Sequence, residues 1–579
     1  MKLLSLHCDY IKFKPVQKAI KEPEALSEEQ KKETISEECL VILTAVEQGD
    51  NENSVKKAVE NIGDIASQVK AKKIVLYPYA HLSSNLAMPA VAERLLKDMG
   101  KALAKKFSVV RAPFGYYKSF ELKCKGHPLS ELSREIRTDG KEIGKEIKGL
   151  GKVEKIQEKE LSENDRRVLL RELSKTKLDT SKLKENDHRI LGQHMDLFSF
   201  NEVAPGMVFW HNNGWIIYNE LVKYWREEHE KAGYQEVSTP FVLDEKIWKI
   251  SGHWEKYKEN IFLTQYENKK MAVKPMNCPG GILIYKTRPR SYKEFPMKVG
   301  ELGIVHRQEL SGVLAGLFRV IKFTQDDAHI YCKEKQLEQE IINIINLTEK
   351  VYKKLGFSYH VELSTRPAKR IGSDEMWDKA EKVLENVLKK KKMKFKLNKG
   401  EGAFYGPKID FHIKDSQGRT WQCGTIQLDF AMPERFELTY IDEDNKEKRP
   451  VMLHRTVLGS FERFIGVLLE HTNGKLPTWL SPIQARVLSF TDRNIKAAKK
   501  TEEQLKESGI RVDSDLKSET IGNKVRNAEL AKIPYIICIG DKEEKSKKLA
   551  VRERGNAKIK SMKIDKFIDN IKQEIAERK

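Results

Sequence analysis

The sequence predicts a multidomain chain of mixed α/β and α+β class, with an antiparallel sheet at the centre of its largest domain. The 579 residues suffice for roughly four domains at the usual size of about 150 residues each. Strand-like and helix-like segments alternate near both ends of the chain, which is typical of compact α/β domains. Between these ends, many strand-like segments are separated by glycine and proline, which favours an α+β domain.

The first domain is predicted at residues 1–140, where the two patterns alternate. Short apolar runs bounded by turn residues indicate strands, and apolar residues that recur every three to four positions indicate helices. Strands are predicted at residues 2–7, 39–46 and 74–79, and helices at residues 55–70 and 88–106.

Three further segments complete the predicted organisation. Residues 141–190 are rich in both charges and poor in aromatic residues, so they are predicted to form a solvated helical linker. Residues 191–478 hold the α+β domain. Residues 479–579 return to alternating strands and helices, which predicts a small separate domain that ends in a helix at 564–575.

Composition narrows the class of function. The formal net charge is +21, and this excess favours a polyanionic partner such as a nucleic acid. The apolar runs are far shorter than the ~18 residues of a membrane span, so a membrane protein is excluded. Seven cysteines without CxxC spacing argue against a disulfide framework and predict a cytoplasmic protein.

Arginines in apolar surroundings indicate phosphate chemistry. No GxxxxGK[ST] loop is present, so phosphates are not expected in a loop of that type. Arg307, Arg319 and Arg463 each lie within a strand-like or helix-like segment. A guanidinium group binds phosphate oxygens bidentately and keeps its charge when desolvated. Because one such arginine is usually a surface ion pair, the interpretation depends on the order of all three.

The segments that contain Arg307 and Arg463, together with an earlier strand, resemble the three ordered motifs of class II aminoacyl-tRNA synthetases. The motifs match the strand that ends at Pro240, the segment Arg307-Gln-Glu309, and the helix that contains Arg463. Longer strings are similar to threonyl-tRNA synthetases. They are Pro275-Met-Asn-Cys278-Pro-Gly, Phe323-Thr-Gln-Asp-Asp-Ala-His329, Glu401-Gly-Ala-Phe-Tyr405-Gly-Pro-Lys408, Trp421-Gln-Cys-Gly-Thr-Ile-Gln427-Leu-Asp-Phe and His454-Arg-Thr-Val-Leu-Gly-Ser.

The resemblance implies a fold and a set of partners. A class II antiparallel-sheet catalytic core is expected between an N-terminal deacylase-like α/β domain and a C-terminal α/β anticodon-binding domain. The implied reaction is ATP-dependent activation of L-threonine and its transfer to tRNA(Thr). The implied assembly is a homodimer whose interface includes the first motif.

The resemblance also implies an ATP site, with Mg²⁺ bound alongside the nucleotide. Arg307 is expected to grip the α-phosphate and Arg463 the γ-phosphate, because positioned cations stabilise the charge that spreads during attack on phosphorus. Glu309 would read the adenine amino group. The implied catalytic residues are Arg307, Arg463 and Lys408, and the implied ATP ligands are Arg307, Glu309, Arg319, Phe323, Gln422 and Arg463.

A catalytic zinc ion, one per subunit, is implied by Cys278, His329 and His454. Their spacing alone would suit three core residues equally well, so the surrounding strings carry this assignment. Zinc that binds both the amine and the hydroxyl of threonine would reject valine, since valine leaves a polar site unfilled. The implied threonine pocket consists of Met276, Gln325, Asp327, Tyr405 and Gln427.

Serine also carries an amine and a hydroxyl, and the missing methyl group is worth only about 1–3 kcal/mol. A second, hydrolytic site is therefore expected. No two histidines lie four residues apart, so the HxxxH helix of the bacterial editing domain is absent. Residues 1–140 instead resemble the archaeal editing domain, which is related to D-aminoacyl-tRNA deacylases. The implied editing residues are His81, Tyr117, Lys118 and Glu131.

The C-terminal domain resembles the anticodon-binding domain of the same family, in which Glu543 and Arg552 are expected to contact anticodon bases. Ser518 and Lys532 depart from the family pattern of asparagine and arginine, and lysine lacks the bidentate fork. Two alternatives stay open at this stage. One is another class IIa ligase, for serine or proline, and the other is an inactive synthetase relative that binds RNA as a regulator.

Overall fold

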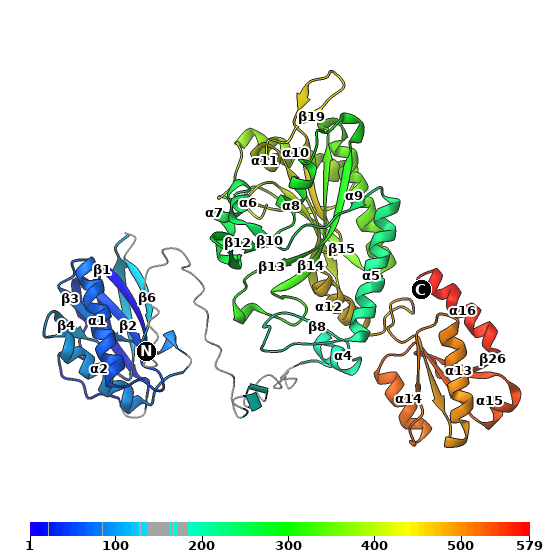
Figure 1. Cartoon of the computed structure of the whole chain (residues 1–579), viewed down its shortest axis with the longest axis horizontal. Coiled ribbons are helices and arrows are strands. Elements are labelled where there is room, and N and C mark those ends of the chain that lie inside the picture. Colours follow the sequence, from blue (N-terminus) through cyan, green and yellow to red (C-terminus); the bar gives the residue numbers. More distant parts are fainter. Residues whose placement is uncertain are drawn as a thin grey trace. The chain divides into compact units, whose positions relative to one another are not determined.

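A computed structural model describes residues 1–20, 23–83, 85–126, 130–136, 163, 166–167, 169–170 and 183–579. The chain forms two compact units, Met1–Gln157 and Glu158–Lys579, which are described separately (Figure 1). Most of the predicted linker at 141–190 lies outside the described residues. No helix in the described part of the chain is both long and apolar enough to span a membrane.

The first unit is an α/β domain built on a six-stranded sheet. Its strand order is β4-β3-β2-β1-β5, with β6 also paired to β1. Parallel pairing of β2, β3 and β4 requires crossovers, which the two helices supply. The elements are β1 (Lys2–Lys18), β2 (Thr34–Ala45), α1 (Glu52–Gln68), β3 (Lys73–Pro78), α2 (Pro89–Leu103), β4 (Ser108–Arg111), β5 (Tyr116–Cys124) and β6 (Glu131–Glu135).

The two faces of this sheet bury different clusters. Leu40, Ile42 and Ile74 pack with the apolar stripes of α1 and α2. Alternate residues of the same strands, such as Val41 and Val75, face a second core that includes Cys8 and Phe13. Each face of the central strands is thus covered, which explains why the sequence shows continuous apolar runs there.

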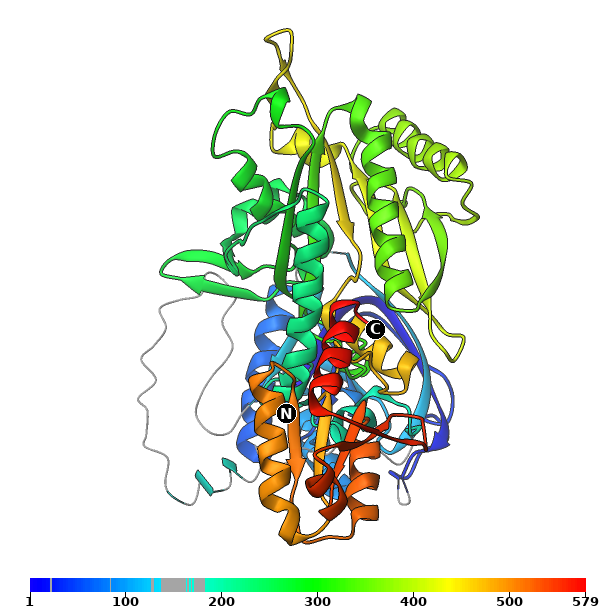
Figure 2. The ribbon, with the colours of Figure 1, turned by 90° about the vertical axis from the view of Figure 1, so that its right-hand side faces the viewer.

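The second unit is centred on an eight-stranded sheet of order β16-β15-β17-β18-β21-β14-β13-β9, mostly antiparallel as expected. Helices α9 and α10 pack side by side against one of its faces (Figure 2). The strands are β9 (Gln235–Glu236), β13 (Met297–His306), β14 (Lys322–Cys332), β15 (Ser358–Ser364), β16 (Phe395–Asn398), β17 (Lys408–Lys414), β18 (Thr420–Asp429) and β21 (Val451–Thr456).

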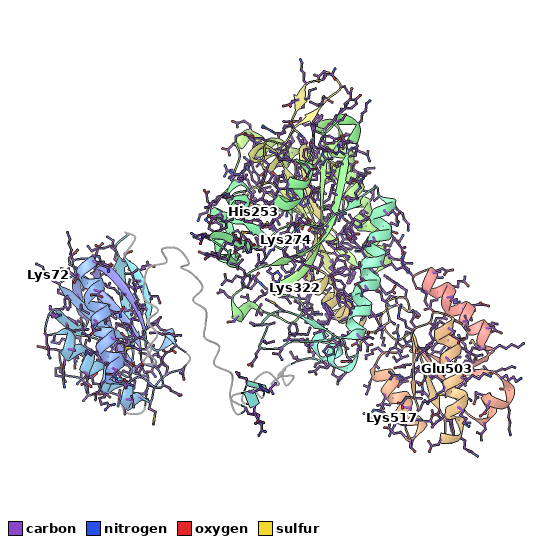
Figure 3. All side chains as sticks on the ribbon, viewed as in Figure 1. Lys72, His253, Lys274, Lys322, Glu503 and Lys517 are labelled. Carbon is purple, nitrogen blue, oxygen red and sulfur yellow. The ribbon has the colours of Figure 1, made fainter. Side chains whose placement is uncertain are left out.

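Helices and small sheets surround this central sheet. The helices are α4 (His188–His194), α5 (Asn212–Lys231), α6 (Glu245–Ile250), α7 (His253–Tyr257), α8 (Cys278–Tyr285), α9 (Glu334–Lys354), α10 (Asp374–Lys390), α11 (Ala431–Arg435) and α12 (Phe461–Thr472). The small sheets pair β7 (Phe198–Ser199) with β8 (Phe209–Trp210), β19 (Tyr440–Ile441) with β20 (Glu447–Lys448), and β12 (Lys269–Val273) with β10 (Val242–Asp244) and β11 (Leu263–Tyr266). The side chains of His253 and Lys274 are buried within this domain (Figure 3).

The last hundred residues form a five-stranded sheet of order β23-β22-β24-β25-β26. Within the second unit, Arg511 Nη1 contacts Glu220 Oε1 of α5 at 3.0 Å and thereby ties this domain to the central one. The elements are β22 (Ala485–Ser489), α13 (Ile495–Glu507), β23 (Val512–Asp515), α14 (Ile521–Leu530), β24 (Tyr535–Ile539), α15 (Asp541–Ser546), β25 (Leu549–Glu553), β26 (Ile559–Met562) and α16 (Ile564–Ala576).

The predicted fold class is confirmed, and the individual elements differ mainly in extent. The first strand continues to Lys18, well beyond the apolar run at 2–7, because its second half pairs with β5 across an exposed surface. The sequence analysis placed no strand at β5, whose residues Tyr116–Cys124 mix aromatic, apolar and charged side chains without a continuous apolar run. The boundaries drawn at 140, 190 and 478 stay predictions.

Candidate active sites

The six residues expected to bind ATP line one cavity of about 450 Å³. Arg307 directly follows β13, Gln422 lies on β18, and Arg463 occupies the first turn of α12. The lining set includes Arg307, Glu309, Arg319, Phe323, Gln422 and Arg463. The structure therefore brings together residues that lie up to 156 positions apart in the chain.

The guanidinium groups of this cavity are held by short contacts. Arg307 lies over the ring of Phe323, 5.1 Å from its centroid. Arg319 Nη2 pairs with Glu309 Oε2 at 2.9 Å. Arg463 Nε donates a hydrogen bond to the carbonyl oxygen of Phe318 at 2.8 Å, which ties α12 to the loop before β14. Three positioned guanidinium groups in one cavity suit a ligand with several phosphates.

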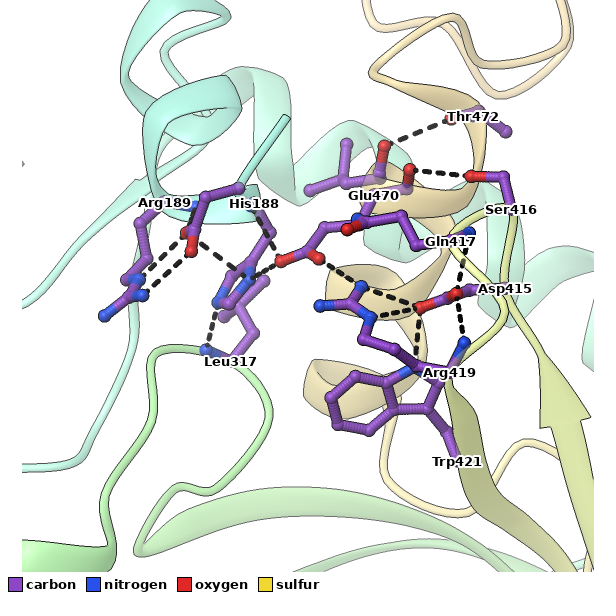
Figure 4. Close-up of polar contacts among 12 residues, drawn as sticks. His188, Arg189, Leu317, Asp415, Ser416, Gln417, Arg419, Trp421, Glu470 and Thr472 are labelled. Atoms are coloured by element: carbon purple, nitrogen blue, oxygen red, sulfur yellow. Dashed lines mark hydrogen bonds and ion pairs between the residues drawn. The ribbon is translucent and has the colours of Figure 1, made fainter. Parts of the chain in front are cut away.

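A buried polar network supports the loop that carries Phe318 (Figure 4). His188 Nδ1 lies 2.7 Å from Glu470 Oε1, and His188 Nε2 accepts the backbone N–H of Leu317 at 2.9 Å. Because a backbone N–H only donates, the ring proton must sit on Nδ1 and point at Glu470. Glu470 also accepts from Arg419 at 2.5 Å. The network links α4, α12 and the loop that carries Phe318.

Local sequence explains the close approach in this network. Gly316 has a φ of +52°, and a Cβ there would lie 2.2 Å from His188 Nε2. Only glycine therefore lets the loop reach the imidazole ring. Burial raises the pKa of Glu470, but hydrogen bonds from His188 and Arg419 outweigh it, so the pKa lies below its usual value. The carboxylate is thus ionised at neutral pH.

A second cavity of about 330 Å³ adjoins the first and is lined by all five residues of the predicted threonine pocket. Arg307, Gln325 and Thr425 line both cavities. Tyr405 donates a hydrogen bond from its hydroxyl to Gln427 Oε1. The pocket residues are Met276, Gln325, Asp327, Tyr405 and Gln427.

The three predicted zinc ligands lie together beside this second cavity, which Cys278 and His454 line. Suitable ligand atoms of Cys278, His329 and His454 all lie within 4.8 Å of one another. Cys278 begins α8, whereas the two histidines face each other across β14 and β21. His329 Nε2 is buried and has no hydrogen-bond partner in the described structure. A buried nitrogen without a partner is costly, so this arrangement fits a metal ligand.

The surroundings of the triad favour a neutral imidazole at His329. Burial lowers the pKa of His329 well below its usual value, and the neighbouring His454 lowers it further. His454 Nε2 lies 2.8 Å from Asp429 Oδ2, an outer carboxylate that fixes the ring orientation. Burial, with Asp327 and Asp429, raises the pKa of the Cys278 thiol, so a thiolate there needs a nearby cation.

Lys408, the third predicted catalytic residue, does not line either cavity in the described structure. Its ammonium group pairs with Asp410 on the same strand. Asp410 in turn accepts from the Gln422 amide at 2.6 Å and from Ser364 at 2.7 Å. Lys408 is therefore connected to the ATP cavity through Asp410, whose carboxylate contacts Gln422.

The first unit has a cavity of its own, of about 380 Å³, lined by His81, Tyr117 and Lys118. Lys118 Nζ donates to the carbonyl oxygens of Pro113 and Tyr116, at 3.0 and 2.9 Å. Burial lowers the pKa of Lys118 to about 8. Glu131, the fourth predicted editing residue, is exposed and does not line this cavity.

The predicted anticodon residues lie on the C-terminal domain and belong to none of these cavities. Glu543 accepts the backbone N–H of Gly540 at 3.1 Å, and Arg552 pairs with Glu529 at 2.6 Å. Both side chains thus have partners within the chain. No geometry among the described residues shows which bases they would contact.

Sequence reasoning missed Asp429 and the network of His188 and Glu470. Asp429 lies within the segment Trp421–Phe430 that resembles the family, but nothing in the sequence indicated its contact with His454. His188 begins a helix directly after Asp187, whose side chain accepts the N–H of Arg189 at 2.9 Å. An Asp-His pair at a helix start was a signal for a cap. The buried partner Glu470 lies 282 residues away and gave no signal.

Family comparisons assign each part of this architecture. The profile "Archaea-specific editing domain of threonyl-tRNA synthetase" matches residues 1–136, and "Anticodon binding domain" matches residues 484–574. The profile "tRNA synthetase class II core domain (G, H, P, S and T)" matches residues 262–472, which carry both cavities of the second unit. The second unit therefore contains a class II tRNA synthetase core.

Individual relatives narrow the family further. The chain is 53% identical over 395 residues to a "Threonine--tRNA ligase" of Clostridium tetani, and 52% identical over 396 residues to one of Carboxydothermus hydrogenoformans. Each match spans 68% of this chain and 62% of the relative. A crystal structure described as the RNA binding domain of threonyl-tRNA synthetase from Cryptosporidium parvum is 42% identical, with a TM-score of 0.65, over 67% of this chain and 98% of that one. The chain belongs to the threonyl-tRNA synthetase family.

Proposed function

We propose that this chain activates L-threonine with ATP and transfers it to tRNA(Thr). The observation that carries the proposal is the continuity of two cavities, one lined by phosphate-binding arginines and the other by a polar pocket with a potential zinc site. Arg307, Gln325 and Thr425 belong to both. A carboxylate in the smaller cavity and an α-phosphate in the larger one would therefore meet beside Arg307.

The chemistry requires little more than positioning. A threonine carboxylate oxygen attacks the α-phosphorus, and the bond to the leaving pyrophosphate breaks. Negative charge grows on the phosphate oxygens during this step, so fixed cations stabilise the transition state. Arg307 lies at the junction, and Arg463 is held by Phe318 on the outer wall. Mg²⁺ is expected to enter with ATP and to neutralise part of the charge.

Cys278, His329 and His454 would hold the zinc ion. Bound there, zinc would supply a Lewis acid that accepts the amine and the hydroxyl of threonine. Asp327 Oδ2 accepts a hydrogen bond from the Asn277 amide at 3.2 Å and lines the same cavity, where it would accept the threonine hydroxyl. Valine would leave these groups unsatisfied, which costs far more than the loss of a methyl contact.

We assign hydrolysis of Ser-tRNA(Thr) to the cavity of the first unit. Lys118 would donate to the ester, with His81 and Tyr117 on the same wall. Glu131 stays a proposed editing residue outside the cavity. In the C-terminal domain, Glu543 and Arg552 are the proposed anticodon contacts. Both side chains would have to leave their present partners within the chain in order to bind a base.

A homodimer and a cytoplasmic location complete the proposal. Strand β9 ends the eight-stranded sheet, so its outer edge is open for pairing in the described structure. The nearby Phe241 and Val242, directly after Pro240, are about half exposed. All seven cysteines are free thiols, which suits a reducing compartment. Sedimentation velocity would test the dimer directly.

ATP–pyrophosphate exchange across the amino acids tests the activity. Exchange that depends on threonine, with serine weakly active and valine inactive, is the expected result. Exchange with proline, or serine preferred over threonine, would favour another class IIa ligase. No exchange with any amino acid, in a protein that still binds tRNA, would favour the inactive relative.

Deacylation of preformed Ser-tRNA and Thr-tRNA tests the editing site. Lys118→Met keeps the length of the side chain and removes its charge and donors. We expect this variant to lose most Ser-tRNA hydrolysis while pyrophosphate exchange stays unchanged. Equal hydrolysis by wild type and variant would remove Lys118 from the mechanism. Fast hydrolysis of Thr-tRNA by the wild type would contradict an editing role.

A further inference from the structure

Two histidines and a glutamate form a cluster at the edge of the eight-stranded sheet, away from the triad of Cys278. His360 and Glu362 lie two positions apart on β15, so their side chains share one face of the strand. His412 lies directly opposite His360 on the neighbouring strand β17. Three side chains with metal-binding atoms therefore project from adjacent positions of the same sheet face.

That face is the one turned away from the helices. Val361, Phe411 and Ile413, which alternate with the cluster, are buried in the core that includes residues of α9 and α10. The cluster residues are consequently on the opposite side of β15 and β17, together with Asp410. Along the row, the next residue opposite His412 is Gln422, which lines the ATP cavity.

The distances suit a single bound ion. His360 Nε2 lies 3.6 Å from Glu362 Oε1, and His412 Nε2 lies 3.7 Å from Glu362 Oε2. Tetrahedral zinc bound to nitrogen or oxygen at about 2.0–2.1 Å places its ligand atoms about 3.3–3.4 Å apart. The imidazole rings are stacked at 15° with centroids 4.9 Å apart, so one ring must turn to aim at a shared ion. His360 is about half exposed and has room to turn.

The hydrogen bonding of the cluster also favours a bound metal ion. His412 Nε2 is buried and has no hydrogen-bond partner in the described structure. Asn398 Nδ2 donates to Glu362 Oε2 at 3.0 Å and holds the carboxylate toward the rings. The cation now nearest to Glu362 Oε1 is the ammonium group of Lys396, at 3.6 Å on an exposed side chain.

From these contacts we infer that His360, Glu362 and His412 form a second metal site, selective for borderline divalent cations such as Zn²⁺, Co²⁺ or Ni²⁺. Two imidazoles and one carboxylate are typical ligands of such ions, and three protein ligands leave a position for water. Lys396 competes with the metal for Glu362. A bound ion joins β15 to β17 beside Asp410, whose other contacts reach Gln422.

Cobalt titration of the full-length protein tests the site. A thiolate ligand gives bound Co²⁺ a charge-transfer absorption that a site of histidine and glutamate lacks, so the Cys278 site is counted separately. We expect a second equivalent of Co²⁺, measured by equilibrium dialysis and metal analysis, that adds no thiolate band. His360→Gln should weaken this equivalent more than tenfold. The control is His194→Gln, at another exposed histidine, which should leave both equivalents unchanged.

Two further variants separate metal binding from a general loss of structure. Asn398→Ala should weaken the second equivalent by about 10–100-fold, as outer-sphere changes usually do. Lys396→Met should tighten it, because the competing charge is removed. A single equivalent in the wild type, or a second equivalent that is unchanged in His360→Gln, overturns the site. These readouts need no catalysis, so they hold whether or not the proposed ligase activity is found.

Discussion

Replacing His188 by alanine should weaken ATP binding. The effect is expected to be indirect, because His188 holds the loop that carries Phe318. The imidazole is buried and bridges Glu470 and the backbone N–H of Leu317. Its ring centroid also lies 4.2 Å from that of Phe318, whose carbonyl oxygen anchors Arg463. Loss of the ring therefore frees both the loop and the side chain of Arg463, the proposed phosphate ligand.

The magnitude follows from the groups left without partners. An unsatisfied Leu317 N–H and the lost hydrogen bond to the Glu470 carboxylate each cost about 1–3 kcal/mol, so the domain should lose roughly 2–6 kcal/mol of stability. Part of this loss would be a cost of ordering the loop when ATP binds. If that cost is about 1.4 kcal/mol, the KM for ATP rises tenfold. Glu470→Gln keeps an acceptor for His188 but removes the charge that Arg419 pairs with, so a smaller increase is expected.

The assay is ATP–pyrophosphate exchange at saturating threonine, combined with thermal unfolding. Ser-tRNA hydrolysis by the same preparation serves as an internal control, because the cavity proposed for editing lies in the other unit, which has its own core. His194→Gln, at the exposed end of the same helix, should change neither quantity. A lowered melting temperature with an unchanged KM for ATP would refute the positioning role, and an unchanged melting temperature would refute the energetic reasoning.

Three further outcomes are expected. Arg463→Ala should lower pyrophosphate exchange by about 10²–10³-fold, as loss of one charge-stabilising donor does, while tRNA binding measured by filter retention stays near wild type; unchanged exchange would contradict its place on ATP. Cys278→Ser should lose most of one zinc per chain, measured by metal analysis, together with threonine activation, whereas a fully active zinc-free wild type would contradict the triad. Burial lowers the pKa of Lys118 to about 8, so its protonated, donating form is lost as the pH rises through 8; enzyme-dependent Ser-tRNA hydrolysis should therefore fall above pH 8, and a rate that rises instead would indicate that neutral Lys118 acts as a base.

The sequence predicted the three α/β and α+β regions because their apolar patterns are local. The helix predicted at 564–575 is observed at Ile564–Ala576, and the strand predicted at 74–79 is observed at Lys73–Pro78, because each has a clear local pattern of apolar residues. Strand β5 was not predicted, because its half-buried and exposed residues form no continuous apolar run, although Phe120, Leu122 and Cys124 alternate with charged residues. Yet β5 carries Lys118, so the resemblance pointed to a proposed editing residue on an element that the apolar runs did not reveal.

The site shows the same division between local strings and distant contacts. Cys278, His329 and His454 were found through their strings, and their approach to within 4.8 Å depends on sheet order that no string contains. Lys408 stood inside an equally strong string, but its ammonium group pairs with Asp410 and it lines neither cavity in the described structure. A string therefore identifies which residues matter together, while the register of β17 against its neighbours decides which of them reach the ligand.

The proposed reaction with threonine would require two cavities. The pocket with Asp327 and the triad would reject a side chain that lacks a hydroxyl, because its polar groups would then be unpaired. It cannot strongly reject serine, which differs only by a methyl group worth about 1–3 kcal/mol. A hydrolytic cavity must therefore make the opposite choice and exclude the methyl by shape. Tyr77, on its wall, is buried and held edge-on by Phe13 and Phe120, at 5.8 and 5.5 Å between ring centroids. The buried Tyr77 ring therefore has a defined position, and a ring fixed there would enforce such a limit on size.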